Sequence, residues 1–330
     1  MHRLWVALIL TGCTHASLPL GNGSDMAQPA AGDMATPVGA AVPDLTPPPA
    51  WQPQPSPTTQ SLRGVWGSSA TDVYAVGLQG TILHSGGDGL WTAQTSGTTK
   101  DLHAIWGSGP HDLYAAGDVL LHSTGDGAWA PQTAPSGLMG VWGSAADDLY
   151  VAGLFGISHS TGDGTWTALS QPEPWGGYFH ARGTSATDVY AVGGFINLND
   201  PSKGGGVAHL TNAQWSWTRL SPPDEMKDIA FTSAGAFIVG LSGQIWAQPS
   251  GGSTFTQQTS PVPWDLQGVW ADDAGTLWAV GGSGSVLRSS GDGHWTSEAS
   301  LFALDLWGVW GSGAHDVYAV GDNGQIFHFN

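Results

Sequence analysis

Carboxylates and imidazoles recur along this chain at nearly constant spacing, and together such groups can bind a metal ion or transfer protons. Five histidines occupy equivalent places in a repeated segment: His84, His122, His159, His209 and His328. Five aspartates precede a segment similar to Val-Tyr-Ala-Val-Gly: Asp72, Asp112, Asp148, Asp188 and Asp316. Four more lie in Gly-Asp-Gly turns: Asp88, Asp126, Asp163 and Asp292. These residues can act jointly only if the fold brings separate repeats to one point, because metal ligands lie about 2 Å from their ion.

A second set of carboxylates is placed irregularly, in the connections around the fourth repeat: Glu173, Asp200, Asp224 and Glu225. A pair of carboxyl groups about 5 to 10 Å apart supports glycoside hydrolysis, which is the alternative function that we consider. The sequence contains no evident Ser/His/Asp set, phosphate-binding loop or two-histidine metal motif. We therefore expect no catalytic residues and no enzymatic activity.

These residues belong to a unit that occurs seven times. One position in the first segment of the unit marks the repeats, at spacings of 40, 36, 40, 48, 40 and 40 residues: Trp66, Trp106, Trp142, Arg182, Ala230, Trp270 and Trp310. Each unit contains four short segments rich in Val, Ile, Tyr and Trp and bounded by Gly, Ser or Asp, as is typical of strands between turns. Four antiparallel strands per unit predict a blade, and seven blades predict an all-β seven-bladed β-propeller over residues 50–330.

The two ends of the predicted ring belong to one blade. The last unit stops at Asn330 after three strands, whereas the segment 50–62 is similar to 128–138, which contains a fourth strand leading into the next unit. We expect the strand containing Trp51 to complete the blade that begins near Leu306. This closure removes an open sheet edge.

A ring separates equivalent residues, so we expect the histidines to bind no metal and the protein to need no cofactor. The aspartates should accept hydrogen bonds from turn amides. Calcium at single Gly-Asp-Gly turns stays an alternative, although one carboxylate is few for an ion that takes six to eight oxygens. The inner tryptophans should wedge between blades, and a second set should pack across blades, with carbohydrate stacking as the alternative: Trp91, Trp129, Trp166, Trp215 and Trp295.

One position of the first strand differs in every repeat between strongly repeated neighbours: Arg63, His103, Met139, Phe179, Lys227, Gln267 and Trp307. Three expanded connections, 171–179, 194–206 and 221–226, are expected at the same end of the ring. Long loops on a rigid scaffold often carry binding residues. We therefore predict a ligand-binding surface from the seven variable residues, with neutral variation as the alternative, together with residues of these connections: Trp175, Tyr178, Asp200, Lys203, Asp224 and Glu225.

The N-terminus has the pattern of a processing signal. The apolar run 4–10 is too short to span a bilayer, and Leu10-Thr11-Gly12-Cys13 follows it. These four residues resemble the bacterial lipobox. The resemblance implies a signal peptide over residues 1–12, lipidation of Cys13 and a location in the bacterial cell envelope, where Thr14 is compatible with sorting to the outer membrane. The Pro-, Ala- and Gly-rich segment 13–49 is expected to be a disordered tether.

The repeats resemble those of bacterial lipoproteins with Trp-Gly-Ser-x-x-Asp-Val-Tyr-Ala-Val-Gly propeller units, and more distantly Asp-box and kelch propellers. The Asp-box comparison is imperfect, because Asp88 comes one position late and Trp91 one early relative to Ser85. A net charge of −18, from 26 acidic and 8 basic residues, excludes nucleic acid as a partner. We expect an outward-facing monomer that acts as a binding or scaffold module for a protein or glycan and that touches the membrane only through its lipid.

Overall fold

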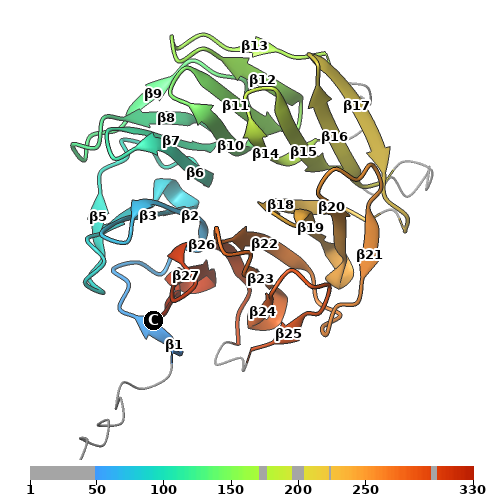
Figure 1. Ribbon diagram of the computed structural model, residues 1–330. Coiled ribbons are helices and arrows are strands. Elements are labelled where there is room, and N and C mark those ends of the chain that lie inside the picture. The colour runs from blue at the N-terminus through green and yellow to red at the C-terminus, as the bar shows by residue number, and fades with distance from the viewer. Residues whose placement is uncertain (1–48, 171–176, 195–203, 223, 299–302) are drawn as a thin grey trace, which may run out of the picture. The chain divides into compact units, whose positions relative to one another are not determined.

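The structure is a computed structural model that describes residues 49–170, 177–194, 204–222, 224–298 and 303–330. In these residues the strands form seven four-stranded antiparallel sheets placed around a common centre (Figure 1). The predicted seven-bladed β-propeller is confirmed. The predicted signal peptide, Cys13 and the tether up to residue 48 lie outside the described residues.

The first four blades each follow the chain from the innermost to the outermost strand. Blade one contains β2 (Leu62–Ser69), β3 (Asp72–Gly77), β4 (Ile82–Ser85) and β5 (Thr92–Gln94). Blade two contains β6 (Leu102–Gly109), β7 (Asp112–Gly117), β8 (Leu120–Ser123) and β9 (Ala130–Gln132). Blade three contains β10 (Leu138–Ala145), β11 (Asp148–Gly153), β12 (Gly156–Ser160) and β13 (Thr167–Ala168). Blade four contains β14 (Tyr178–Ser185), β15 (Asp188–Gly193), β16 (Gly206–Thr211) and β17 (Gln214–Arg219).

The last three blades follow the same plan, except that the outer strand of blade seven comes from the N-terminal side. Blade five contains β18 (Met226–Thr232), β19 (Gly235–Gly240), β20 (Ile245–Pro249) and β21 (Thr256–Gln258). Blade six contains β22 (Leu266–Ala271), β23 (Leu277–Gly281), β24 (Ser285–Ser289) and β25 (Thr296–Ser297). Blade seven contains β26 (Leu306–Gly313), β27 (Asp316–Gly321), β28 (Ile326–Phe329) and β1 (Trp51–Gln54). Short 3₁₀ turns connect the second and third strands of four blades: η1 (Leu78–Gly80), η2 (Leu241–Gly243), η3 (Gly282–Gly284) and η4 (Asp322–Gly324).

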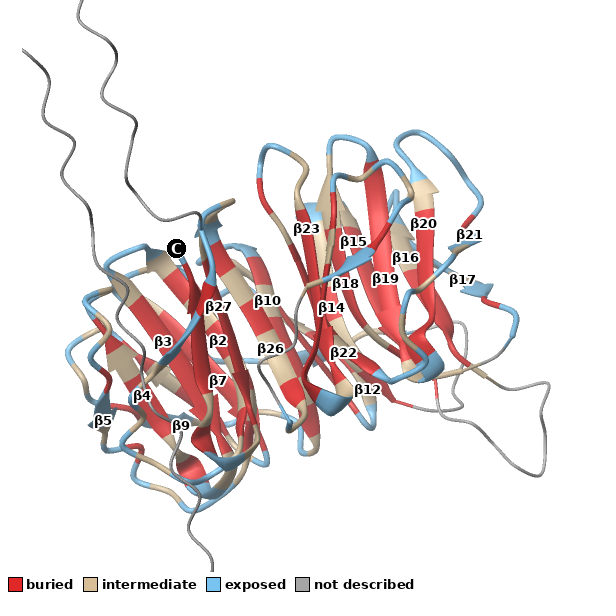
Figure 2. Cartoon of the chain, turned by 90° about the horizontal axis from the view of Figure 1, so that it is seen from below, coloured by how far each residue is buried: buried red, intermediate tan, exposed pale blue. Residues whose placement is uncertain are grey.

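The core lies between the blades rather than in one central layer. The second strand of each blade is buried along almost its whole length, as in β3, where Val73 to Gly77 are all buried (Figure 2). A strand covered on both faces by neighbouring sheets needs apolar residues on both faces, which explains its near-continuous apolar sequence. Among the described residues, no helix is long and apolar enough to cross a membrane.

The inner tryptophans wedge between blades, as predicted, and the glycine after each tryptophan makes room for them. A Cβ on Gly107 would lie 2.8 Å from Cη2 of Trp66 in the preceding blade, and a Cβ on Gly143 would lie 2.7 Å from Cη2 of Trp106. Such distances are too short for carbon atoms in contact. The repeated Trp-Gly pair therefore serves two interfaces, since the tryptophan enters the next blade and the glycine receives the tryptophan of the previous one.

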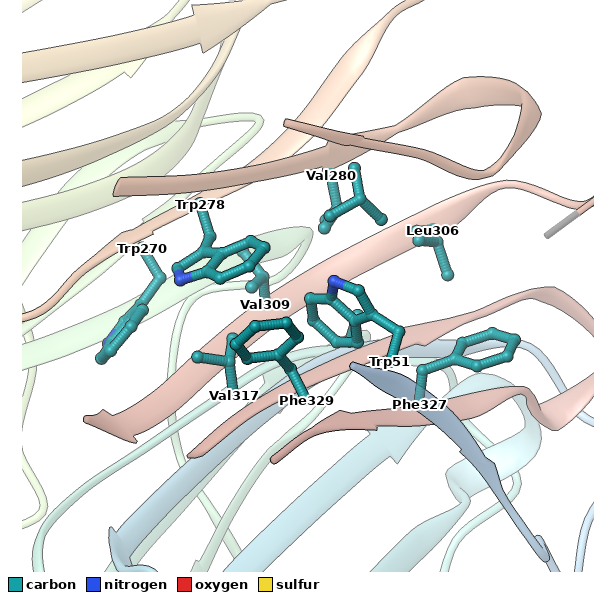
Figure 3. Packing of buried hydrophobic residues seen from close by; sticks show 11 residues of the cluster. Trp51, Trp270, Trp278, Val280, Leu306, Val309, Val317, Phe327 and Phe329 are labelled. Carbon is teal, nitrogen blue, oxygen red and sulfur yellow. The ribbon is translucent and has the colours of Figure 1, made fainter. Parts of the chain in front are cut away.

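The ring closes as the sequence predicts. Strand β1 pairs antiparallel with β28, with Trp51 opposite Phe329 and Pro53 opposite Phe327. The indole of Trp51 packs 5.4 Å from the ring of Trp278 in blade six and 5.6 Å from that of Phe329, measured between ring centres (Figure 3). The N-terminal strand thereby completes blade seven and also contributes to the interface with blade six.

Five blades share a hydrogen-bonded network that the sequence analysis assigned differently. In blade one, Asp72 lies 2.8 Å from Nε2 of His84 and accepts a 2.5 Å hydrogen bond from Ser68, while the His84 ring stacks on Tyr74 with a 4.4 Å centre distance. The corresponding aspartates are Asp112, Asp148, Asp188 and Asp316. The prediction that these aspartates accept from turn amides is wrong, because each carboxylate links the first and third strands within its blade. The prediction is correct for Asp88, which accepts from the backbone N–H of Leu90 at 3.0 Å.

Candidate functional site

The seven variable residues occupy the same irregularity in their blades. In blade one, Leu62 pairs with Gly77 and Gly64 pairs with Val76, so Arg63 is skipped by the ladder in a β-bulge. The same shift follows the first residue of the innermost strand in all seven blades. A bulge redirects the side chain of the extra residue and removes it from the regular packing. The variable residues are thus the ones that the regular strand pairing of their blades leaves out.

Close approach of the inner strands accounts for the small residue that follows the bulge in five blades. A Cβ on Gly140 would lie 2.7 Å from the carbonyl oxygen of Phe179 in the next blade, and a Cβ on Gly308 would lie 3.0 Å from that of Arg63. Adjacent blades therefore meet backbone to backbone at this level. The space that remains for the bulged side chains lies toward the centre of the ring.

All seven variable residues line one cavity of about 380 Å³ at this end of the ring, together with Leu78, Asp101 and His180. We call this cavity the channel mouth. A second cavity of about 230 Å³, the inner channel, is lined by residues of all seven innermost strands. Four residues line both cavities: Arg63, His103, His180 and Trp307. The structure brings together the seven residues that sequence comparison of the repeats had singled out.

Arg63 and Trp307, from the first and last blades, meet across the point where the ring closes. The Arg63 guanidinium carbon lies 3.6 Å from the centre of the Trp307 ring, a distance at which a cation–π contact is favourable. The indole N–H of Trp307 donates a 2.9 Å hydrogen bond to Asp322. Burial lowers the pKa of Arg63, and Asp322, Asp101 and Asp305 offset only part of that effect.

Lys227 forms a second cation–aromatic pair at the channel mouth. Its Nζ lies 3.7 Å from the centre of the Phe179 ring and 2.7 Å from a carboxylate oxygen of Glu225. Glu225 therefore lies beside the mouth as the partner of a rim residue. Asp224 accepts a 2.6 Å hydrogen bond from Gln244.

A buried polar cluster in blades four and five was not predicted as part of the site. Asp228, whose side chain is 3% exposed, lies 3.3 Å from both Nδ1 of His180 and Nε of Arg182. Its carboxylate also accepts hydrogen bonds from the backbone N–H groups of Ile229 at 2.8 Å and Val269 at 3.0 Å. Paired charge and backbone donors compensate the cost of burying this carboxylate.

Burial also lowers the pKa of two histidines at the channel mouth. For His180 burial is the largest cause, opposed by Asp228 and reinforced by Arg182. For His103 burial again dominates, opposed by Asp118 and Asp101. Burial therefore favours the neutral form of the imidazole at both positions.

The other predicted binding residues have different fates. Tyr178 is a correction: its side chain is buried and packs edge-on against Trp217 with a 6.1 Å centre distance, so it belongs to the core and not to the binding surface. Asp224 and Glu225 lie next to the mouth, with the partners given above. Trp175, Asp200 and Lys203 lie outside the described residues, as does Glu173.

The recurring histidines and turn aspartates do not gather in the structure. Among the residues that the structure describes, no group of three or more His, Cys, Asp or Glu side chains is arranged to hold a metal ion. The outer tryptophans contact the neighbouring blade: the indole N–H of Trp91 donates to Gln54 at 2.6 Å, and that of Trp129 to Gln94 at 2.8 Å.

Comparison with solved structures places this chain among β-propellers. No family model matches the chain, and neither does any curated protein. YCF48 from Cyanidioschyzon merolae is 19% identical with a TM-score of 0.68, over 85% of this chain and 99% of that one. Virginiamycin B lyase from Staphylococcus aureus is 14% identical with a TM-score of 0.73, over 86% and 99%.

Two further solved structures are similar to this chain. YCF48 bound to a D1 peptide is 16% identical with a TM-score of 0.69, over 84% of this chain and 96% of that one. The WD40 β-propeller domain of Doa1 is 12% identical with a TM-score of 0.70, over 85% and 97%. At these identities the similarity shows the fold alone.

Proposed function

We propose that this chain is a binding module of the bacterial cell envelope, a β-propeller held on the outer membrane by a lipid on Cys13 that receives a partner protein at the channel mouth. One observation supports this proposal most strongly. The seven side chains that differ between otherwise repeated units all line one cavity. A ring scaffold can be identical in every blade, whereas a site for an asymmetric partner must differ from blade to blade.

A protein partner suits the channel mouth better than a glycan. Sugar rings stack on open aromatic faces, but Arg63 lies over one face of Trp307 and Lys227 over one face of Phe179. The remaining rim mixes thioether, amide, imidazole and cationic groups, as protein interfaces do. A propeller of the same architecture, YCF48, has been solved with a bound peptide.

The alternative of glycoside hydrolysis has less support among the described residues. Of its four candidate carboxylates, Asp224 is hydrogen-bonded to Gln244 and Glu225 is paired with Lys227. The remaining two, Glu173 and Asp200, lie outside the described residues. Virginiamycin B lyase has a similar fold, so the architecture alone does not decide between binding and catalysis.

Capture from envelope extracts tests the proposed function. The full chain is immobilised as the natural sequence, as the rim variant M139A/Q267A/W307A, and as the control L90A, in which an exposed leucine outside the two cavities is replaced. We expect a specific protein to be retained by the natural chain and by L90A and to be lost from the rim variant, with equal melting temperatures. Equal retention by all three proteins contradicts the proposed site.

A further inference from the structure

We propose that the channel mouth binds the carboxyl terminus of a partner protein whose last residues are apolar, with the terminal carboxylate held by Arg63. This inference rests on the proposed function and specifies the chemistry of its ligand. The carboxylate would meet the guanidinium where the channel mouth and the inner channel join. The preceding apolar side chain would pack on the outer part of the mouth.

The cations of this strongly acidic chain are concentrated at the two cavities. The described residues contain six lysines and arginines: Arg63, Lys100, Arg182, Arg219, Lys227 and Arg288. Three of these six line the inner channel or the channel mouth, namely Arg63, Arg182 and Lys227. In a chain of net charge −18 this arrangement requires a local reason.

Two of the three cations already have carboxylate partners. Arg182 pairs with Asp228 at 3.3 Å, and Lys227 pairs with Glu225 at 2.7 Å. Within the described residues, Arg63 forms no ion pair and its side chain donates no hydrogen bond. Its guanidinium makes a cation–π contact with the Trp307 ring. The contact with the Trp307 ring is not a hydrogen bond, so the five guanidinium N–H donors remain available to a bidentate acceptor.

The three carboxylates that act electrostatically on Arg63 accept hydrogen bonds from other groups. Asp322 accepts from the indole of Trp307 at 2.9 Å, and Asp101 and Asp305 accept from backbone N–H groups of 3₁₀ turns at 2.9 and 2.8 Å. These groups favour the charged form of Arg63 without meeting its donors. A partly buried cation with unmet donors and lining a cavity is suited to one incoming anion.

The surroundings of Arg63 select a single carboxylate next to apolar groups. Met139, Phe179, Leu78 and the Trp307 ring line the same cavity as the guanidinium. A partner surface rich in acids would be repelled by the net charge of the whole chain. A chain end offers one carboxylate, an adjacent apolar side chain and a shape narrow enough to enter a cavity of about 380 Å³.

Pentapeptide pools provide a direct test. The probes are Gly-Gly-Ser-X-Z peptides with Phe, Leu, Val or Met at X and Z, labelled at the amino end with an uncharged dye and prepared as free acids and as amides. A third pool, Gly-Gly-Asp-X-Z amide, carries an internal carboxylate. Binding to the purified full chain is measured by fluorescence polarisation. We expect the free-acid pool to bind at least about tenfold more tightly than either amide pool, as for a charge-assisted bidentate hydrogen bond.

Variants assign the effect to one residue. Arg63→Gln should remove the preference for the free acid, whereas Arg63→Lys should retain part of it, because charge persists without the planar fork. The matched control is Arg288→Gln: Arg288 also lies near a tryptophan ring, 5.1 Å from that of Trp278, but lines neither cavity. Its replacement should leave all pools unchanged.

The remaining outcomes overturn the inference in separate ways. Equal binding of the free-acid and amide pools, or no binding by any pool, would show that the site does not recognise a carboxylate. Equal binding of the free-acid pool and the internal-acid pool would show that the site recognises a carboxylate but does not require a chain end. Each of these results leaves the capture experiment on the rim variant to decide the proposed function independently.

Discussion

Replacing Trp51 by alanine tests whether the N-terminal strand holds the ring closed. The Trp51 side chain is 5% exposed, so about 95% of roughly 200 Å² of tryptophan surface is buried. At about 25 cal/mol per Å² this burial contributes about 5 kcal/mol, of which the alanine methyl group retains about 1. We therefore expect a loss of about 4 kcal/mol in the free energy of unfolding, within the range usual for buried tryptophan.

Urea unfolding followed by near-ultraviolet circular dichroism measures this loss. The control is Trp264→Ala, because Trp264 is 51% exposed and its replacement should change the free energy by less than about 0.5 kcal/mol. The slope against urea should stay the same in both variants, since neither alters how much surface unfolding exposes. A loss below about 1 kcal/mol for Trp51→Ala would refute the closure argument, because it would show that the indole contributes little where blades six and seven meet.

Three further predictions concern the packing between blades, the lipid anchor and the buried tyrosines. Gly107→Val should lower the free energy of unfolding by about 1 to 3 kcal/mol, because its Cβ would lie 2.7 Å from the carbonyl oxygen of Asp112 and 2.8 Å from the Trp66 ring. Gly109→Val, with open space around it, should be nearly neutral, and equal losses in urea would contradict the close packing around Gly107. Cys13→Ala should move the protein from the membrane pellet to the soluble fraction and abolish palmitate labelling, and continued sedimentation with membranes would reject the lipid anchor. Absorbance at 295 nm during alkaline titration should show little ionisation of five tyrosines at pH 11, because burial, reinforced by a nearby aspartate, raises the pKa of each to about 12. Between pH 10 and pH 12 the folded state keeps protons that the unfolded state has released. The stabilisation that these tyrosines give to the folded state is therefore complete below pH 10 and is lost toward pH 12. The five residues are Tyr74, Tyr114, Tyr150, Tyr190 and Tyr318.

The fold could be predicted because the same pattern of strands and turns recurs along the chain. Each unit contains strand-length apolar segments between turn residues, and the truncated last unit shows where the first strand must pair. The gathering of the seven variable residues could also be predicted, since equivalent positions near the axis of a ring face one another. The bulge that directs these side chains inward has no signature of its own in one repeat.

The polar cluster around Asp228 shows what the repeat alignment could not reveal. The signal was present: blades four and five carry His180 and Asp228 where other blades carry glycine or alanine, and Arg182 and Ala230 where they carry tryptophan. Each departure taken alone resembles a degenerate repeat. In the structure Asp228 contacts His180 and Arg182 of the neighbouring blade. The spacing of residues within one repeat does not show which residues of two repeats are in contact.

Tyr178 and the aspartates of the hydrogen-bonded network were misassigned for a related reason. Tyr178 follows a variable connection, yet it is the first strand residue and takes the buried place that leucine holds in most other blades. Asp72 follows a turn, yet its carboxylate turns back into the blade toward Ser68 and His84. Adjacency to a loop in sequence does not fix the direction of a side chain.

The bulge in every innermost strand separates the seven variable positions from the residues that pair the strands. A residue that takes no part in the ladder can be exchanged without disturbing the hydrogen bonds of its sheet or the wedges between sheets. The ring can therefore diversify at seven positions at once, much as a hypervariable surface does on an invariant framework. An engineered library confined to Arg63, His103, Met139, Phe179, Lys227, Gln267 and Trp307 would sample new specificities while each member keeps the parent architecture.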